Sequence, residues 1–313
     1  MYKIVRYSAE FESEWNSFLA IAKNSVFLFN RSFLEYHSDR FVDHSVIVQK
    51  KNKIVALFPA NESGREIVSH GGLTFGGLIM HSDLRALDTL EIFRELLRYY
   101  REKSFESIIY KVKPNIFNVL PSEEDLYALT INQAVLIRRD LSSVIDLNRR
   151  PRFSESKRQA VKKCEKENIE INESHDYTEY WNLLVDVLAK FSTRPTHTVS
   201  EIGMLVKLFP GNIRLFEARK QGTLLAGLVI FDYGDVVHTQ YMANSESGRV
   251  IGALDYLNHF LITNVFNHKR YYSFGISTER MGSYLNAGLI QQKEMMGARG
   301  VVHDFYKIEL KND

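Results

Sequence analysis

The sequence predicts a mixed α/β protein, with α+β mixed sheets, built from two tandem copies of one element order. Strand, turn, strand, turn, strand, helix and strand are expected in residues 45–110 and again in residues 212–276. Short polar segments separate the β-rich runs, as hairpin turns do. The chain has 313 residues, 45% hydrophobic and 25% charged, which is typical of a globular protein with about two domains.

The elements follow from period-2 and period-3.6 apolar patterns. The first copy is predicted to contain strands at 45–50, 54–60 and 66–70, a helix at 84–103 and a strand at 107–113. The second copy is predicted to contain strands at 213–219, 224–231 and 236–242, a helix at 251–267 and a strand at 270–276.

A boundary between two domains is expected near residues 148–156, where polar residues surround Pro151. This divides the chain into domains 1–148 and 149–313. Two β runs, 135–138 and 144–147, precede the boundary. Helices at 156–167 (capped by Ser154 or Ser156), 177–191 and 199–209 follow it, and a helix at 283–296 and a strand at 301–310 end the chain.

Several chemistries are excluded or made less favourable by composition. The net charge of +2 argues against a DNA-binding protein. No phosphate-binding loop, nucleophile elbow or zinc-ligand spacing occurs, so no metal is expected. The single cysteine, Cys164, fits a reducing compartment and is interpreted as a bystander rather than a nucleophile. No apolar run is long enough to span a bilayer, so a cytoplasmic location is expected, with a peripheral position at the inner membrane face left open.

A glycine-rich loop follows the third strand of the first copy. His70, Gly71 and Gly72 begin this segment, 69–78, and predict a substrate-lining loop with His70 as a polar contact or base. The alternative is a connection packed against the other domain. In the segment 193–201, Arg194 and His197 are candidates for holding an anionic group, beside a helix capped by Thr198 or Ser200.

The third strand of the second copy carries unusual polar residues. Strict alternation places His238, Gln240 and Met242 on one face, which predicts a pocket lining or an internally satisfied polar group. After the next strand, Glu279 is a candidate general base if it is buried, with a helix cap as the alternative. Lys293 is a candidate for stabilising an oxyanion or holding a phosphate, with a solvated helix charge as the alternative.

These segments together resemble the FemAB-related, tandem-GNAT group of acyltransferases, over nearly the whole chain. The phrase Asn286-x-Gly288-Leu289 with Lys293 is similar to the end of the Fem-like second domain. The resemblance implies two acyl-CoA N-acyltransferase domains. It also implies that Arg249 and Gly252, which fit part of the motif Arg/Gln-x-x-Gly-x-Gly/Ala, hold the donor pyrophosphate.

The resemblance predicts an N-acyltransferase that uses acyl-CoA, in the simplest case acetyl-CoA, and a small-molecule or lipid-linked amine acceptor such as an amino sugar or cell-envelope precursor. Glu279, His238 and His70 are the expected catalytic residues, with the acceptor between the domains. Two alternatives stay open: a FemAB-type enzyme that uses aminoacyl-tRNA, and a non-catalytic binding module. The basic run 149–166, with eight Lys and Arg against two acids, is either a solvated face or a docking surface for an anionic donor or lipid-linked acceptor.

Overall fold

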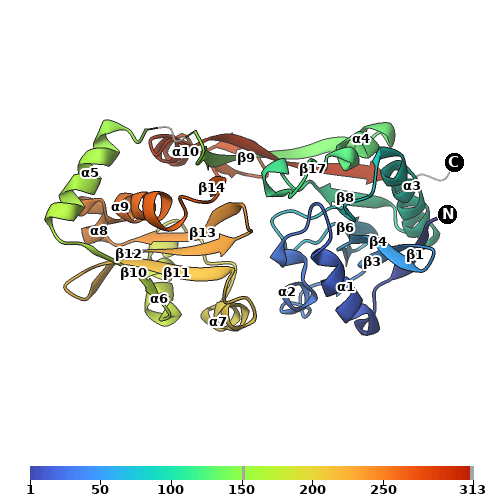
Figure 1. The fold of residues 1–313 in the computed structure, drawn as a ribbon, viewed down its shortest axis with the longest axis horizontal. Helices are drawn as coiled ribbons and strands as arrows, with labels where there is room; N and C mark the ends of the chain where they lie inside the picture. Colours follow the sequence, from blue (N-terminus) through green and yellow to red (C-terminus); the bar gives the residue numbers. More distant parts are fainter. Residues whose placement is uncertain (150–151, 311–313) are drawn as a thin grey trace. The chain divides into compact units, whose positions relative to one another are not determined.

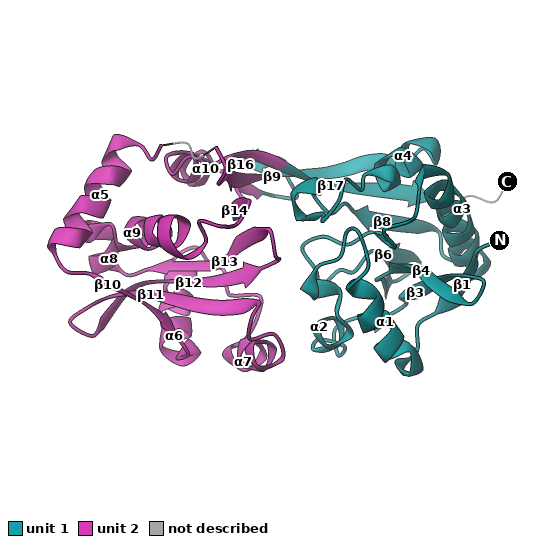
Figure 2. Cartoon of the chain, viewed as in Figure 1, with its two compact units in different colours: residues 1–140, 279–284, 302–313 teal, residues 141–278, 285–301 magenta. Residues whose placement is uncertain are grey.

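The computed structural model describes residues 1–149 and 152–310, so Arg150 and Pro151 of the predicted boundary lie outside the described residues. The chain divides into two compact units, which Figure 2 colours separately. Unit 1 comprises residues 1–140, 279–284 and 302–313, and unit 2 comprises residues 141–278 and 285–301. Each unit therefore combines segments that are distant in sequence. The division into domains 1–148 and 149–313 stays a prediction.

Unit 1 contains two groups of paired strands (Figure 1). The first has the order β1 (Lys3–Arg6), β3 (Val46–Lys50), β4 (Lys53–Phe58), β7 (Ile79–Met80). The second has the order β17 (Arg299–Glu309), β8 (Ser107–Lys111), β6 (Glu66–Val68), β5 (Asn61–Ser63), β2 (Val42–Asp43). The predicted turn between β3 and β4 is confirmed, because Lys51 and Asn52 both have positive φ, as a type I′ turn requires. The chain then changes sheet after Phe58, so the three predicted strands do not form one meander.

One long amphipathic helix organises the core of unit 1. Helix α3 (Ala86–Glu102) buries Ile92, Phe93, Leu96 and Tyr100, which recur at helical spacing, against Phe58 and other residues of both strand groups. Helices α1 (Glu12–Leu19), α2 (Arg31–Glu35) and α4 (Glu124–Ile131) complete the α-helices of this unit in the described residues. The apolar period of residues 84–103 therefore predicted the helix correctly to within two residues at each end.

Unit 2 is a twisted sheet with helices on both faces (Figure 1). Its strand order is β10 (Glu170–Ser174), β11 (Ile213–Lys220), β12 (Thr223–Asp232), β13 (Val236–Asn244), β14 (Tyr271–Ile276), β9 (Val135–Asp146). Helix α9 (Ala253–Phe260) covers one face, and α5 (Glu155–Lys166) packs on α9. Helices α6 (Tyr177–Ala189) and α7 (Val199–Leu208) cover the other face.

Three predicted elements differ from the structure. The two β runs at 135–147 form the single strand β9, because Asp140, Ser142 and Ser143 are buried within it rather than turning the chain. The helix predicted at 251–267 is interrupted, because Ile251 ends a separate helix, α8 (Glu246–Ile251), and α9 passes into a π-helical turn at Leu261–Val265. The helix predicted at 283–296 is shortened to α10 (Ala287–Glu294). No helix in the described ranges is long and apolar enough to cross a membrane.

Candidate functional site

Two parallel strands of unit 2 separate part-way along their length. Strands β13 and β14 form a ladder of three residue pairs that ends at His238 and Ser273. Beyond this pair β13 continues to Asn244 and β14 to Ile276. Where parallel strands separate at their carboxyl ends, backbone groups on both become available to a ligand. The segments beyond His238 and Ser273 are called the β13–β14 opening below.

A β-bulge lies directly beyond the last pair of this ladder. Tyr241 pairs with Val229 of β12 and Thr239 pairs with Ile230, so Gln240 is an inserted residue with no partner in the β12 register. A bulge re-aims the backbone of the inserted residue and interrupts the alternation of side chains. The backbone amide of Gln240 is therefore a candidate hydrogen-bond donor at the β13–β14 opening.

The bulge corrects the predicted facing of the side chains on β13. Met242 packs with Val237 against the core that α9 covers. Tyr241 packs against Trp181 of α6, with ring centroids 5.2 Å apart. The prediction that His238 and Met242 share a face is therefore wrong, because the inserted residue shifts the alternation by one.

His238 lies at the base of the opening. Its half-buried ring hydrogen-bonds through Nδ1 to the hydroxyl of Ser273, 3.1 Å away. Gly275 of β14 also lies against the ring of His238. Its φ is +72°, and a Cβ added at this position would lie 3.1 Å from His238 Cε1. The structure therefore fixes His238 from β14 and requires glycine at position 275.

Lys293 of α10 is buried against the end of β14. Its ammonium donates to the carbonyl oxygens of Gly275 (3.0 Å) and Ile276 (2.7 Å) and to the hydroxyl of Ser277 (2.9 Å). The side chain is only 2% exposed, and burial lowers the pKa of Lys293 to about 8. It is therefore no solvated helix charge. Since its three N–H bonds all have acceptors in the chain, its geometry is that of a residue that fixes the backbone beside His238.

The candidates Glu279 and Asn286 lie near the end of β14 but do not share the burial of Lys293. Glu279 is exposed and belongs to the segment 279–284 of unit 1, so the burial on which its role as a base depended is absent. Asn286 caps α10, with its side-chain oxygen accepting from the amide of Leu289 at 3.0 Å. The backbone N–H of Asn286 donates to the backbone carbonyl of Ser277 at 2.9 Å. Asn286 thus orients the helix that supplies Lys293.

Arg194 and His197 line one cavity of about 640 Å³ beside α6 and the start of α7. Trp181 and Val185 of α6 form an apolar wall, and Arg194 is exposed. The buried ring of His197 bonds through Nδ1 to the hydroxyl of Tyr241, 2.6 Å away. The cavity wall therefore touches the bulged strand through Tyr241.

The predicted cap of α7 is also present. Thr198 and Glu201 form a reciprocal capping box, in which each side chain accepts from the backbone amide of the other residue. The segment therefore caps α7 and also lines the cavity.

Arg249 and Gly252 lie in and after the short helix α8 rather than in an open loop. The amides of Arg249 and Gly252 bond to the carbonyls of Ser245 and Gly248, both at 2.9 Å. Gly252 has φ +86°, and a Cβ there would lie 2.6 Å from the Cβ of Ala160 in α5. Packing of α5 and a left-handed helix end thus give a second reason for glycine at 252. The role of both residues toward a pyrophosphate stays a prediction.

Unit 1 contains a comparable parallel ladder. Strands β6 and β8 pair in parallel up to Val68 and Ile109. Counting from the last pair of each ladder, His70 corresponds to Gln240 of unit 2, and Val68 corresponds to His238. His70 therefore lies two residues beyond the position of unit 1 that corresponds to His238.

The residues after β6 fill the region where β6 and β8 separate. Lys111 donates through Nζ to the carbonyls of His70 (3.1 Å) and Leu73, and its own carbonyl accepts from the amide of Gly76 at 2.9 Å. Burial, reinforced by Arg138, lowers the pKa of Lys111 to about 7. Sequence reasoning missed Lys111, although one lysine inside the apolar run 108–112 was a usable signal.

The predicted loop residues are held by packing inside unit 1. Gly72 is in close contact with the ring of His37, and a Cβ on Gly71 would lie 2.9 Å from Phe41. His70 is buried with a left-handed φ of +64°, and burial lowers its pKa to about 3. A neutral imidazole with so low a pKa is a weak general base at neutral pH. The predicted substrate contacts of this loop remain predictions.

Neither a metal centre nor a reactive thiol is present in the described part of the chain. No group of three or more potential metal ligands occurs there. Cys164 is buried, and burial raises the pKa of its thiol to about 11. A buried thiol of high pKa is unreactive.

Comparison with known proteins identifies the fold. No family model matches the sequence, and no curated protein matches it by sequence. The structure is similar to that of FemX, with a TM-score of 0.69 and 10% identity over 98% of this chain and 97% of the other. It is similar to a tandem GNAT protein from the clavulanic acid biosynthesis pathway, with a TM-score of 0.55 and 11% identity over 100% of both chains. L-PGS from Bacillus licheniformis is similar with a TM-score of 0.61 and 14% identity over 97% of this chain and 92% of the other.

These likenesses extend over nearly the full length of both partners. At 10–14% identity they establish the fold and leave the substrates open. The chain has the FemAB and tandem-GNAT acyltransferase-like fold, with mixed α/β sheets.

Proposed function

We propose that the protein is an N-acyltransferase that transfers an acyl group from an activated donor to an amine, with the β13–β14 opening of unit 2 as the reaction site. The fold supports the reaction class. The observation that carries the proposal is the combination of separating parallel strands with a bulge at Gln240 and a fixed His238 at their junction.

The proposed reaction is a direct transfer. The nitrogen of a neutral amine attacks the acyl carbon, the bond from that carbon to the donor's sulfur or oxygen breaks, and one proton leaves the nitrogen. His238 is the proposed acceptor of this proton because it is half-buried and oriented by Ser273. The amide of Gln240 is the proposed donor to the oxyanion of the tetrahedral intermediate.

Lys293 receives a positioning role in this proposal. Its ammonium has three acceptors at the end of β14, so it holds the backbone of Gly275 and Ile276 next to His238. A direct contact with the oxyanion would require the loss of one of these bonds. Glu279, which is exposed, is the weaker candidate base.

Acyl-CoA is the first candidate donor, with Arg249 and Gly252 at its pyrophosphate. An aminoacyl-tRNA is the second candidate, because one observation counts against a pyrophosphate at Arg249 and Gly252. The amides of Arg249 and Gly252 are engaged inside and at the end of α8, and Ala160 of α5 packs on Gly252. A pyrophosphate at that position would compete with these contacts.

The cavity lined by Arg194 and His197 is the proposed acceptor site. The guanidinium of Arg194 favours an acceptor amine that also carries an anionic group, such as a carboxylate or phosphate. The apolar wall of the cavity favours an acceptor with an apolar part beside this group. His197 and Tyr241 connect this cavity to the bulged strand.

Titration calorimetry with acetyl-CoA and with free CoA tests the donor. Saturable binding that is lost in Arg249→Glu, but kept in the control Lys207→Glu on the exposed side of α7, would support the acyl-CoA reaction. Absence of binding at millimolar donor would contradict it, and charged tRNA is then the next titrant. If neither donor binds, the protein is a binding module and the proposed reaction is wrong.

A further inference from the structure

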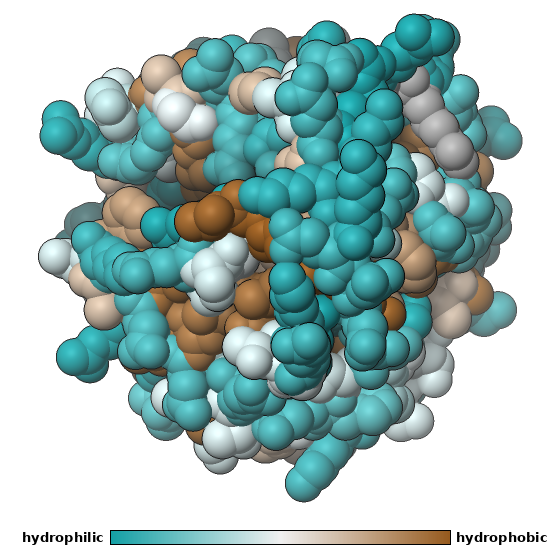
Figure 3. All heavy atoms as spheres, turned by 90° about the vertical axis from the view of Figure 1, so that its left-hand side faces the viewer, coloured by the Kyte–Doolittle hydropathy of each residue, from teal (hydrophilic) through white to brown (hydrophobic). Residues whose placement is uncertain are grey.

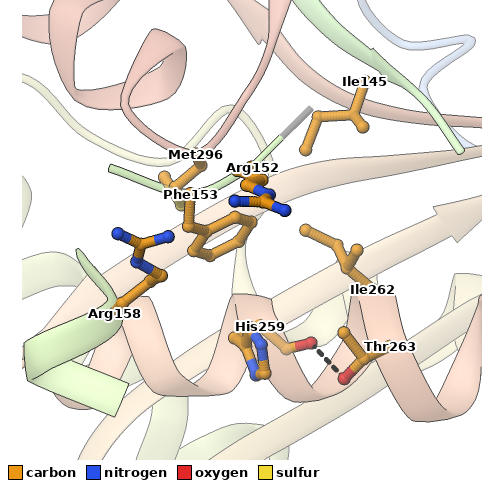
Figure 4. A pocket seen from close by; sticks show the side chains of 8 residues that line it. All are labelled: Ile145, Arg152, Phe153, Arg158, His259, Ile262, Thr263 and Met296. Atoms are coloured by element: carbon orange, nitrogen blue, oxygen red, sulfur yellow. Dashed lines mark hydrogen bonds between the residues drawn. The ribbon is translucent and has the colours of Figure 1, made fainter. Parts of the chain in front are cut away.

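A second cavity of unit 2 lies apart from the β13–β14 opening. It has a volume of about 340 Å³ and is lined by residues of β9, α5, α9, the π-helical turn and the segments beside α5 and α10 (Figure 4). None of its lining residues belongs to β13 or β14. The proposed transfer reaction leaves this cavity unused.

The interior of the cavity is apolar. Ile145, Ile262 and Met296 form a floor that is at most 4% exposed. The ring of Phe153 stands over the floor and meets the imidazole of His259 edge-on, with ring centroids 5.4 Å apart. Burial lowers the pKa of His259, so its ring is neutral at pH 7 and acts as part of the wall.

The rim of the cavity is cationic. Arg152 and Arg158 both line it, and Figure 4 shows the guanidinium of Arg152 above the hollow, between Phe153 and Ile262. Arg158 forms an ion pair with Glu155 on the same helix. Arg152 is exposed and forms no hydrogen bond or ion pair with any residue in the described ranges. One positive charge at the rim is therefore uncompensated.

The end of unit 2 that carries α5 combines hydrophobic and hydrophilic atoms at its surface (Figure 3). Figure 3 looks at the end of unit 2 that carries α5 and shows hydrophobic atoms in a hollow bordered by hydrophilic side chains. The segment that carries Arg152 and Phe153 is fixed there, because the amide of Ser154 donates to the carbonyl of Met295 at 2.8 Å. The rim is thus held in place from α10.

We propose that this cavity binds a monoanionic amphiphile, namely a carboxylate on an apolar chain or ring. The apolar part would lie on Ile145, Ile262 and Met296, and the carboxylate would pair with the guanidinium of Arg152. A monoanion fits better than a dianion, because Glu155 already neutralises Arg158. None of the residues that line this cavity belongs to the proposed donor or acceptor site.

The test is calorimetric titration of the full chain with octanoate, octyl phosphate and octanol. We expect saturable binding of octanoate with one site per chain, and weaker binding of both other probes. Arg152→Met keeps an unbranched side chain and removes the charge. It should lower the affinity for octanoate by about 10- to 100-fold, the range for loss of a charge-assisted hydrogen bond. Lys162→Met, at an exposed position of α5, is the matched control and should leave the affinity unchanged.

A second measurement locates the ligand. The imidazole resonances of His259 should shift on addition of octanoate in the wild type and in Lys162→Met. Absence of octanoate binding at millimolar concentration, equal affinity in Arg152→Met, or octanol binding as tightly as octanoate would each overturn the proposal. Tighter binding of octyl phosphate would overturn the assignment of a monoanion.

Discussion

Replacing Lys293 by methionine isolates the effect of one buried ammonium. The group is 2% exposed and donates to Gly275, Ile276 and Ser277. Methionine keeps an unbranched side chain of similar length and removes both the charge and the three donors. The variant therefore tests whether the end of β14 is held by a cation that is costly to bury.

The magnitude follows from the lowered pKa. Burial lowers the pKa of Lys293 from 10.5 to about 8, so the unfolded chain binds more protons than the folded protein between these values. Stability then rises with pH across this window. About 2.5 pH units at about 1.36 kcal/mol each give about 3 kcal/mol in total, of which about 2.5 kcal/mol falls between pH 7 and 10. Lys293→Met lacks this rise.

The assay is urea unfolding of both proteins at pH 7, 8, 9 and 10. The free energy of unfolding of the wild type, minus that of Lys293→Met, should increase by about 2.5 kcal/mol over this range. The subtraction removes the titration of other groups that both proteins share. Lys166→Met, at an exposed position of α5, should give a flat difference. A flat difference for Lys293→Met as well would refute the reasoning.

Three further outcomes are expected. Gly252→Ala should lower the free energy of unfolding by about 1–3 kcal/mol, because φ is +86° and the new Cβ meets Ala160. Gly203→Ala, whose new Cβ enters open space on α7, is the control and should raise the free energy of unfolding by up to about 1 kcal/mol. Thermal unfolding measures both, and an unaffected Gly252→Ala protein would contradict the described packing. His238→Ala should reduce turnover at least about 100-fold in a transfer assay, and a wild-type rate would remove it as the base. Cys164 should react with a thiol reagent only after unfolding, and rapid labelling of the native protein would show that it is accessible.

The elements that sequence predicted well depend on local chemistry. The turn at Lys51 and Asn52 adopts the positive φ values that a two-residue hairpin needs, and α3 follows from the spacing of Ile92, Phe93 and Leu96. The cap of α7 was predicted as Thr198 or Ser200, and the structure has Thr198. These features are decided by residues within a few positions of each other.

The site was only partly predictable, because its geometry depends on distant segments. His238 and Lys293 were singled out separately, but their common attachment to the end of β14 requires the register of β13 and the docking of α10. The bulge at Gln240 has no sequence signal, since it is defined by the pairing with β12. Gly252 was interpreted as a phosphate contact, whereas its packing on Ala160 is visible only in three dimensions.

The filled region between β6 and β8 has a consequence for stoichiometry. In unit 1 the chain's own residues after β6 bond to Lys111 at the position that corresponds to the β13–β14 opening of unit 2. A ligand entering there would have to displace the loop that carries His70, Leu73 and Gly76, whereas at the β13–β14 opening the carbonyls bound by Lys293 belong to β14 and its end. With the proposed reaction site in unit 2 alone, titration is expected to give a single donor equivalent per chain rather than two.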